Sequence, residues 1–165
     1  MGEHEEALEV QLGRLLTEAG LTIATAESCT GGLISHRITN VSGSSNYFLG
    51  GVVSYSNEAK ARILGVSRRS LELYGAVSEQ VALEMARGAR RLFHSDLAIS
   101  ATGIAGPTGG TPEKPVGLVY VALAAPDGEW CERHLWAGDR ETNKRLTAEA
   151  ALSMVVRYLA QRKGA

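Results

Sequence analysis

Residues 21–38, LTIATAESCTGGLISHRI, decide the predicted fold because this one segment changes from strand to turn to helix. Its first part, residues 21–26, is short and mostly apolar, which indicates a buried strand. A turn of small and polar residues follows at 27–32, and apolar side chains then recur at helical spacing over 33–38. A strand that leads through such a turn into a helix is the repeating unit of α/β proteins.

Similar patterns on both sides of this segment predict further elements. Helices are expected at 5–19, at 57–64 after an Asn57 cap, near 78–94, and at 140–161 after an Asp139 cap. Strands are expected at 49–55, 97–101, 118–125 and 130–136. Pro126, Asp127 and Gly128 are typical of a hairpin turn, so the last two strands are expected to pair antiparallel. We therefore predict one three-layer α/β domain over residues 1–165, with helices on both faces of a mixed parallel and antiparallel sheet.

The charge balance excludes several classes of partner. The chain has 17 Lys and Arg against 18 Asp and Glu, so no general attraction to nucleic acid or to an anionic membrane is expected. No apolar run approaches the roughly 18 residues of a membrane span. The acidic residues 1–8 also lack the apolar core of a signal peptide. We expect a cytoplasmic protein that binds neither nucleic acid nor membrane.

Cysteine and histidine usage predicts neither a disulfide framework nor a metal centre. Cys29 and Cys131 are too few for the scaffold of a small secreted domain. The histidines are scattered without the short pairings that build a zinc site: His4, His36, His94 and His134. We expect no metal and no cofactor.

The turn at residues 27–32 is the first candidate for chemistry because it joins a strand to a helix. Such a turn exposes backbone N–H groups, which can hold an oxyanion or a phosphate. In the alternative interpretation, Ser28 or Thr30 only caps the helix and the two glycines only ease the turn.

Residues 55–60, YSNEAK, form the second candidate. With Asn57 as the cap, Lys60 lies in the first helical turn, where the helix dipole disfavours a cation. Burial would further lower the pKa of this lysine, so a neutral amine could act as a base and activate Ser28. The alternative is an ordinary exposed lysine.

Two further segments could bind a nucleotide. Residues 102–110 are rich in glycine, but they lack the Gly-Lys-Ser/Thr ending of a P-loop, which argues against NTPase chemistry. A flexible glycine lid is the alternative there. Arg140 follows Asp139 at a helix start, where a guanidinium suits phosphate, although a surface arginine beside a cap is the simpler explanation.

Together these segments resemble the CinA C-terminal domain family, and the resemblance spans nearly the whole chain. Its motifs occur in one order: AESCTGG at 26–32, GSS at 43–45, YSNEAK at 55–60, LGV at 64–66, GAVSE at 75–79, GIAGP at 103–107, KPVG at 114–117 and GDR at 138–140. The best-characterised members of this family are nicotinamide-nucleotide amidases. The resemblance therefore implies hydrolysis of the carboxamide of nicotinamide mononucleotide, giving nicotinic acid mononucleotide and ammonia.

The resemblance also implies roles for particular residues. By position, Ser28 is the nucleophile, Lys60 its base, and Tyr55 a third catalytic residue that steers protons or holds the lysine. The implied substrate-binding residues are Glu27, Thr30, Gly31, Gly32, Thr102, Gly103 and Arg140, with Arg140 on the phosphate. Many relatives carry a further N-terminal domain with pyrophosphatase activity, and we expect no such activity from these 165 residues.

Two other interpretations of the sequence give a different nucleophile or a different function. Cys29 could be the nucleophile because it lies at the same helix start, although no histidine is near it in sequence. Alternatively, the chain is a non-catalytic nucleotide-binding protein linked to competence or DNA damage, which is the association of the resembled family. Apolar helical faces and the resemblance both favour a homodimer.

Overall fold

Five strands form one mixed sheet in the computed structural model, which describes residues 5–163. The strands are β1 (Ile23–Glu27), β2 (Phe48–Val53), β3 (Leu97–Gly103), β4 (Leu118–Ala125) and β5 (Gly128–Leu135). Their order across the sheet is β2-β1-β3-β4-β5. Strand β1 runs parallel to β2 and β3, whereas β3 with β4 and β4 with β5 pair antiparallel.

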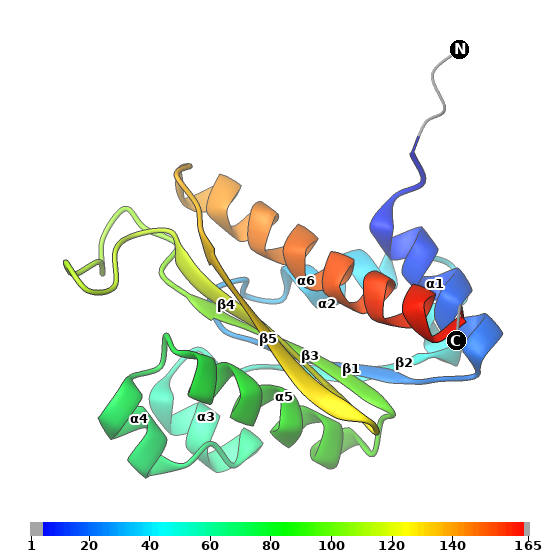
Figure 1. The fold of residues 1–165 in the computed structure, drawn as a ribbon, viewed down its shortest axis with the longest axis horizontal. Coiled ribbons are helices and arrows are strands. Elements are labelled where there is room, and N and C mark those ends of the chain that lie inside the picture. Colours follow the sequence, from blue (N-terminus) through cyan, green and yellow to red (C-terminus); the bar gives the residue numbers. More distant parts are fainter. Residues whose placement is uncertain (1–4, 164–165) are drawn as a thin grey trace.

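In residues 5–163, six α-helices cover this sheet on both faces. They are α1 (Leu8–Ala19), α2 (Leu33–Thr39), α3 (Asn57–Leu64), α4 (Arg68–Tyr74), α5 (Glu79–Phe93) and α6 (Arg140–Lys163). Helices α1, α2 and α6 lie on one face, and α3, α4 and α5 lie on the other (Figure 1). The predicted α/β fold with a mixed sheet between two helical layers is confirmed.

Each face of the sheet buries its own apolar cluster. On the α1, α2 and α6 side, Leu16, Ile99 and Leu152 are fully buried members of the larger cluster. On the α5 side, Met85 packs with small residues of β1 such as Ala24. Full burial of one such large side chain contributes roughly 1.5–3 kcal/mol. These clusters hold the central strands, and thereby the strand ends, in a rigid frame.

Helices α3 and α5 approach each other closely at Gly88. A β carbon at this position would lie 1.9 Å from the carbonyl oxygen of Leu64, so only glycine allows the two helices to come this near. Leu64 ends α3, the helix that carries Lys60. This contact therefore positions Lys60 relative to the sheet.

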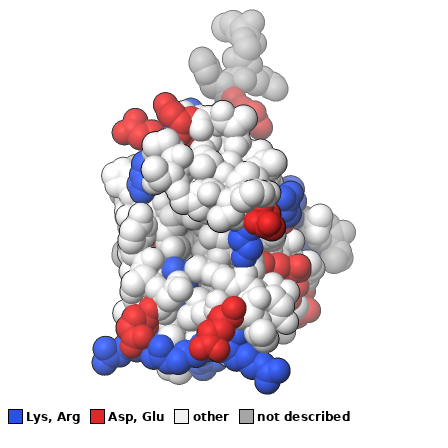
Figure 2. Space-filling model, turned by 90° about the vertical axis from the view of Figure 1, so that its left-hand side faces the viewer, with Lys and Arg blue, Asp and Glu red and all other residues white. Residues whose placement is uncertain are grey.

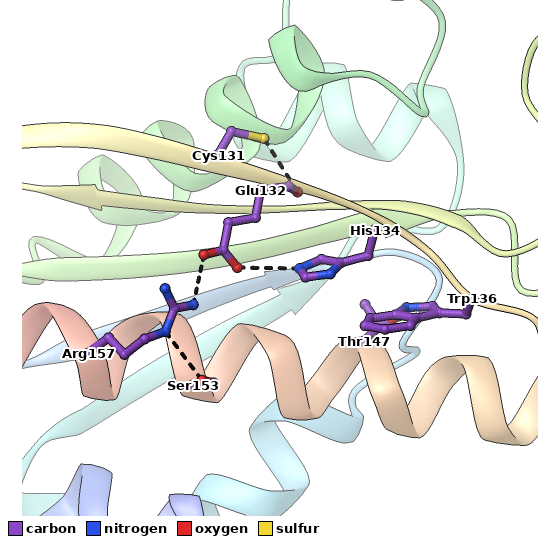
Figure 3. A network of polar contacts seen from close by, with 7 residues as sticks. All are labelled: Cys131, Glu132, His134, Trp136, Thr147, Ser153 and Arg157. Carbon is purple, nitrogen blue, oxygen red and sulfur yellow. Dashed lines mark hydrogen bonds and ion pairs between the residues drawn. The ribbon is translucent and has the colours of Figure 1, made fainter.

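Helix α6 is attached to the edge strand β5 by polar contacts (Figure 3). Arg157 Nη2 donates to a carboxylate oxygen of Glu132 at 2.7 Å, and His134 Nε2 lies 3.3 Å from the other oxygen. Trp136 stacks on the His134 ring with centroids 4.7 Å apart, and its Nε1 donates to Thr147 Oγ1 at 3.0 Å. These contacts fix the orientation of α6, whose first turn reaches the candidate site.

Some predicted boundaries are wrong for local reasons. Helix α1 begins at Leu8 instead of residue 5, because Ala7 is extended and offers no side-chain cap. Ser56, not Asn57, caps α3, since the Ser56 hydroxyl accepts the Ala59 N–H at 3.1 Å. Helix α4 was not predicted at all; none of its side chains is fully buried, and Leu71 packs against the apolar cluster on the α5 side.

The end of the molecule that carries α4 and the loop 104–117 has mixed charge. Figure 2 shows Lys and Arg atoms among uncharged residues in the middle of this face, with basic and acidic side chains side by side along its lower edge. In residues 5–163, no helix combines the length and apolar character needed to cross a bilayer.

Candidate active site

The carboxyl ends of three neighbouring strands meet at one cavity of about 190 Å³. Because β1, β2 and β3 are parallel, the residues that follow or end them lie at the same edge of the sheet, where α/β proteins commonly bind ligands. The cavity is lined by these members of the predicted site: Ser28, Tyr55, Lys60, Thr102, Gly103 and Arg140. The other predicted members belong to the chain around the turn and do not line it: Glu27, Thr30, Gly31 and Gly32.

Ser28 and Lys60 are in direct contact although 31 residues separate them along the chain. Lys60 Nζ lies 3.0 Å from Ser28 Oγ, and it donates to the carbonyl oxygens of Ser54 at 2.8 Å and Tyr55 at 3.5 Å. Lys60 is only 1% exposed, so the exposed-lysine interpretation is wrong. No ion pair found in residues 5–163 includes it.

The surroundings of Lys60 favour its neutral form. Burial lowers the pKa of this amine below the ordinary 10.5 because a low-dielectric environment disfavours the ammonium. The nearby Cys29 acts in the opposite direction to a smaller extent. A neutral amine has two N–H donors and one lone pair, which match two carbonyl oxygens and one hydroxyl. The contacts of Lys60 are therefore suited to a base directed at Ser28.

Ser28 lies where the chain leaves β1 and turns sharply. Its N–H donates to the carbonyl of Ala101 on β3 at 3.0 Å, which continues the strand pairing as far as the serine. Gly31 and Gly32 then adopt φ angles of 61° and 106°, a region that side chains disfavour. These glycines let the chain reverse immediately after the candidate nucleophile.

The same turn presents backbone donors that the protein does not use. Among the hydrogen bonds of residues 5–163, none involves the N–H of Cys29, Thr30 or Gly32. The Thr30 hydroxyl is also buried, with no partner in this part of the chain. An unpaired buried polar group costs about 1–3 kcal/mol, and such groups are found where a ligand can satisfy them.

Tyr55 and Arg140 contact each other at the cavity. Arg140 Nη2 donates to the Tyr55 hydroxyl at 3.1 Å, and Arg140 Nη1 donates to the Gly106 carbonyl at 2.8 Å. Tyr55 is 64% exposed. Its hydroxyl contacts Arg140, whereas its backbone carbonyl oxygen is the atom that contacts Lys60. The Thr102 hydroxyl, in turn, donates to the Ala76 carbonyl at 2.9 Å.

Glu27 is oriented away from the cavity and caps α2. Its fully buried carboxylate accepts hydrogen bonds from the N–H groups of Ile34 at 2.8 Å and Ser35 at 3.0 Å, and from the Ser35 hydroxyl at 2.7 Å. These three donors make the carboxylate a helix cap, with no contact to the cavity that would serve its predicted substrate-binding role.

We expect Glu27→Ala to lower the free energy of unfolding by about 2–3 kcal/mol, because it leaves the N–H groups of Ile34 and Ser35 unpaired in the interior, while the Ser35 hydroxyl keeps only its contact with the Thr25 hydroxyl. Glu27→Gln keeps one acceptor oxygen and should lose less. Urea unfolding of both variants measures the difference. A variant that unfolds like the wild type but binds substrate poorly would instead support the original prediction for Glu27.

Cys29 is a poor candidate for the nucleophile. Burial is the main cause that raises the pKa of its thiol to about 12, so the reactive thiolate is scarce at neutral pH. Within residues 5–163 no hydrogen bond involves a histidine and Cys29. The cysteine alternative therefore lacks the base and the low pKa that it requires.

Some residues at the cavity were not predicted. Asn57 was expected only as a cap, yet it lines the cavity beside Lys60. Ala76 and Val77 also line it, and their only sequence signal was their membership in the GAVSE motif. Ser54 holds Lys60 through its backbone carbonyl, which no side-chain pattern could have indicated.

Within residues 5–163 no group of three or more His, Cys, Asp or Glu side chains is arranged to hold a metal ion; His4 lies outside them.

The chain is thus an α/β protein with a buried serine and lysine pair in a cavity at the carboxyl ends of parallel strands. A sequence model of the CinA C-terminal domain matches residues 5–159, and the chain belongs to this family. Solved structures of similar proteins have the same fold. A competence/damage inducible protein, CihA, from Agrobacterium tumefaciens is 40% identical with a TM-score of 0.87, covering 95% of this chain and 98% of that one. A CinA superfamily protein from Enterobacter cloacae is 33% identical with a TM-score of 0.91, covering 96% of each chain.

The curated relatives are longer proteins. A CinA-like protein of Citrifermentans bemidjiense is 54% identical over 161 residues, which is 98% of this chain but 39% of that relative. The chain thus spans about two fifths of the length of such relatives.

Proposed function

We propose that this chain is an amidohydrolase that converts nicotinamide mononucleotide and water to nicotinic acid mononucleotide and ammonia. The observation that carries the proposal is the 3.0 Å contact between Ser28 Oγ and the amine of Lys60. This amine is buried and forms no ion pair with a carboxylate of residues 5–163. A serine paired with a base of lowered pKa is a nucleophile for acyl transfer. The choice of this amide rests on the resemblance to family members that are nicotinamide-nucleotide amidases.

In the first half of the reaction, Lys60 removes the hydroxyl proton while Ser28 Oγ attacks the carboxamide carbon. The resulting oxyanion is stabilised by the free N–H group of Cys29, which directly follows the serine. The Lys60 ammonium then gives its proton to the amide nitrogen, the C–N bond breaks, and ammonia leaves an ester on Ser28. One oxyanion donor contributes about 3 kcal/mol in comparable sites.

In the second half, water replaces ammonia as the reactant. Lys60 takes a proton from the water as its oxygen attacks the ester carbon, and it returns this proton to Ser28 Oγ when the acyl–oxygen bond breaks. The product is the carboxylic acid, and both side chains regain their starting forms. Every proton transfer passes through one nitrogen, which explains why the lysine must be neutral at rest.

An ammonia-release assay tests the proposal. The purified chain should form ammonia and nicotinic acid mononucleotide in equal amounts from nicotinamide mononucleotide, with ammonia measured by a coupled enzyme and the acid by chromatography. The alternative, a non-catalytic nucleotide-binding protein linked to competence or DNA damage, predicts binding of the nucleotide by calorimetry without any ammonia. The expected homodimer is independent of this assay and stays a prediction.

A further inference from the structure

Two basic residues lie one turn apart on α6 and have different partners. Arg140 lines the cavity, and two of its donors are used by the Tyr55 hydroxyl and the Gly106 carbonyl. Lys144 lies four residues further along, so both side chains project from one side of the helix. No hydrogen bond or ion pair of residues 5–163 involves Lys144. All three N–H donors of Lys144 are therefore uncommitted, whereas Arg140 already uses two of its five for the Tyr55 hydroxyl and the Gly106 carbonyl.

The Lys144 ammonium lies beside the turn that contains the candidate nucleophile. A β carbon built on Gly31 would be 3.5 Å from Lys144 Nζ, an ordinary van der Waals distance, so the ammonium lies close to the turn at this residue. Lys144 is also close enough to Cys29, a lining residue of the cavity, to lower the pKa of its thiol. Lys144 thus lies beside the turn and near Cys29, but it is not itself among the residues that line the cavity.

The turn itself has donors for an anion. The N–H groups of Thr30 and Gly32 have no partner in residues 5–163, and the buried Thr30 hydroxyl has none either. The buried carboxylate of Glu27, which lies just before the turn, accepts three hydrogen bonds from α2. A cation beside several free N–H groups is the chemistry that recognises a phosphate.

We propose that Lys144 and the part of the turn at residues 30–32 form the subsite for the 5′-phosphate of the nucleotide, with Arg140 mainly holding Tyr55 and the loop at Gly106. The assignment rests on the proposed function and deepens it. It accounts for selection of a nucleotide over the nucleoside, because a nucleoside has no phosphate oxygens to accept hydrogen bonds from these donors.

Lys144→Gln tests the subsite. We expect its kcat/KM for nicotinamide mononucleotide to fall about tenfold to a hundredfold, mainly through KM, as one charged hydrogen bond is lost. The fall for nicotinamide riboside, which lacks the phosphate, should be at least tenfold smaller. Arg145→Gln, at the exposed neighbouring position of the same helix, is the matched control for a loss of positive charge. Equal falls for both substrates, or a fall of the same size in Arg145→Gln, would overturn the assignment.

A second measurement separates this inference from the proposed function. Titration with ribose 5-phosphate by calorimetry needs no amide cleavage, so it reports on the subsite even in a chain that releases no ammonia. Binding by the wild type that weakens about tenfold or more in Lys144→Gln supports the subsite. Equal binding by both, or none by the wild type, overturns it, whatever the ammonia assay gives.

Discussion

Ser28→Ala is expected to abolish ammonia release, with kcat falling by about four orders of magnitude or more, as when a serine hydrolase loses its nucleophile. The hydroxyl contributes one side-chain contact, that with Lys60, so removing it should change the free energy of unfolding by only about 1 kcal/mol. Binding of nicotinamide mononucleotide should persist. Single-turnover assays, together with calorimetric binding and urea unfolding, separate lost chemistry from lost structure.

Cys29→Ser is the matched control, since it changes the adjacent side chain of the same turn. We expect this variant to keep most of the wild-type activity, because the Cys29 thiol, whose pKa is raised to about 12 by burial, takes no part in the proposed reaction. An inactive Cys29→Ser together with an active Ser28→Ala would transfer the nucleophile to the cysteine.

Lys60→Arg should be inactive, with kcat at least about a thousandfold below that of the wild type, because a guanidinium keeps its proton and cannot accept another from Ser28. The bulkier group could disturb a position that is 1% exposed, so Lys60→Met, which has similar length and no nitrogen, is tested beside it. Both variants should be folded by circular dichroism and bind the nucleotide. An active Lys60→Arg would mean that the residue serves only as a cation.

The pH dependence of kcat/KM of the wild-type protein is a second test of Lys60 as the base. Only the neutral amine accepts the serine proton, so kcat/KM should be low where Lys60 is protonated and should rise as the pH increases through its pKa. Burial lowers this pKa below 10.5, so the rise should be complete at a lower pH than an exposed lysine would allow. A rate that falls with increasing pH across this limb would contradict the role of Lys60 as a base.

Much of the fold could be read from local sequence because each element had a local cause. The strand, turn and helix at residues 21–38 were recognised from their change of apolar pattern, and β4 was predicted with its observed bounds, Leu118–Ala125. Helix α5 begins next to residue 78, where a helix was expected to start, and Ser78 is its cap. Helix α4 was not found in this way: it is only seven residues long, none of its side chains is fully buried, and Leu71 packs against the apolar cluster on the α5 side.

The same distinction between local sequence patterns and tertiary contacts applies to the candidate site. The sequence by itself determined which residues to consider: a serine and two glycines at a strand-to-helix turn, a lysine in a first helical turn, and an arginine after a helix cap. It also determined the family, through motifs spread over nearly the whole chain. These are local patterns, and each can be recognised without knowing what lies next to it in space.

Only the tertiary structure decided what each of these residues contacts. It brought Lys60 to 3.0 Å from Ser28, turned the Glu27 carboxylate to the start of α2, and placed Lys144 beside Gly31. The physical reason is that these contacts depend on how parallel strands align their ends and how closely helices pack, as α3 does on α5 at Gly88. Burial of a charge, and with it the lowered pKa of Lys60, arises only when such distant segments enclose it.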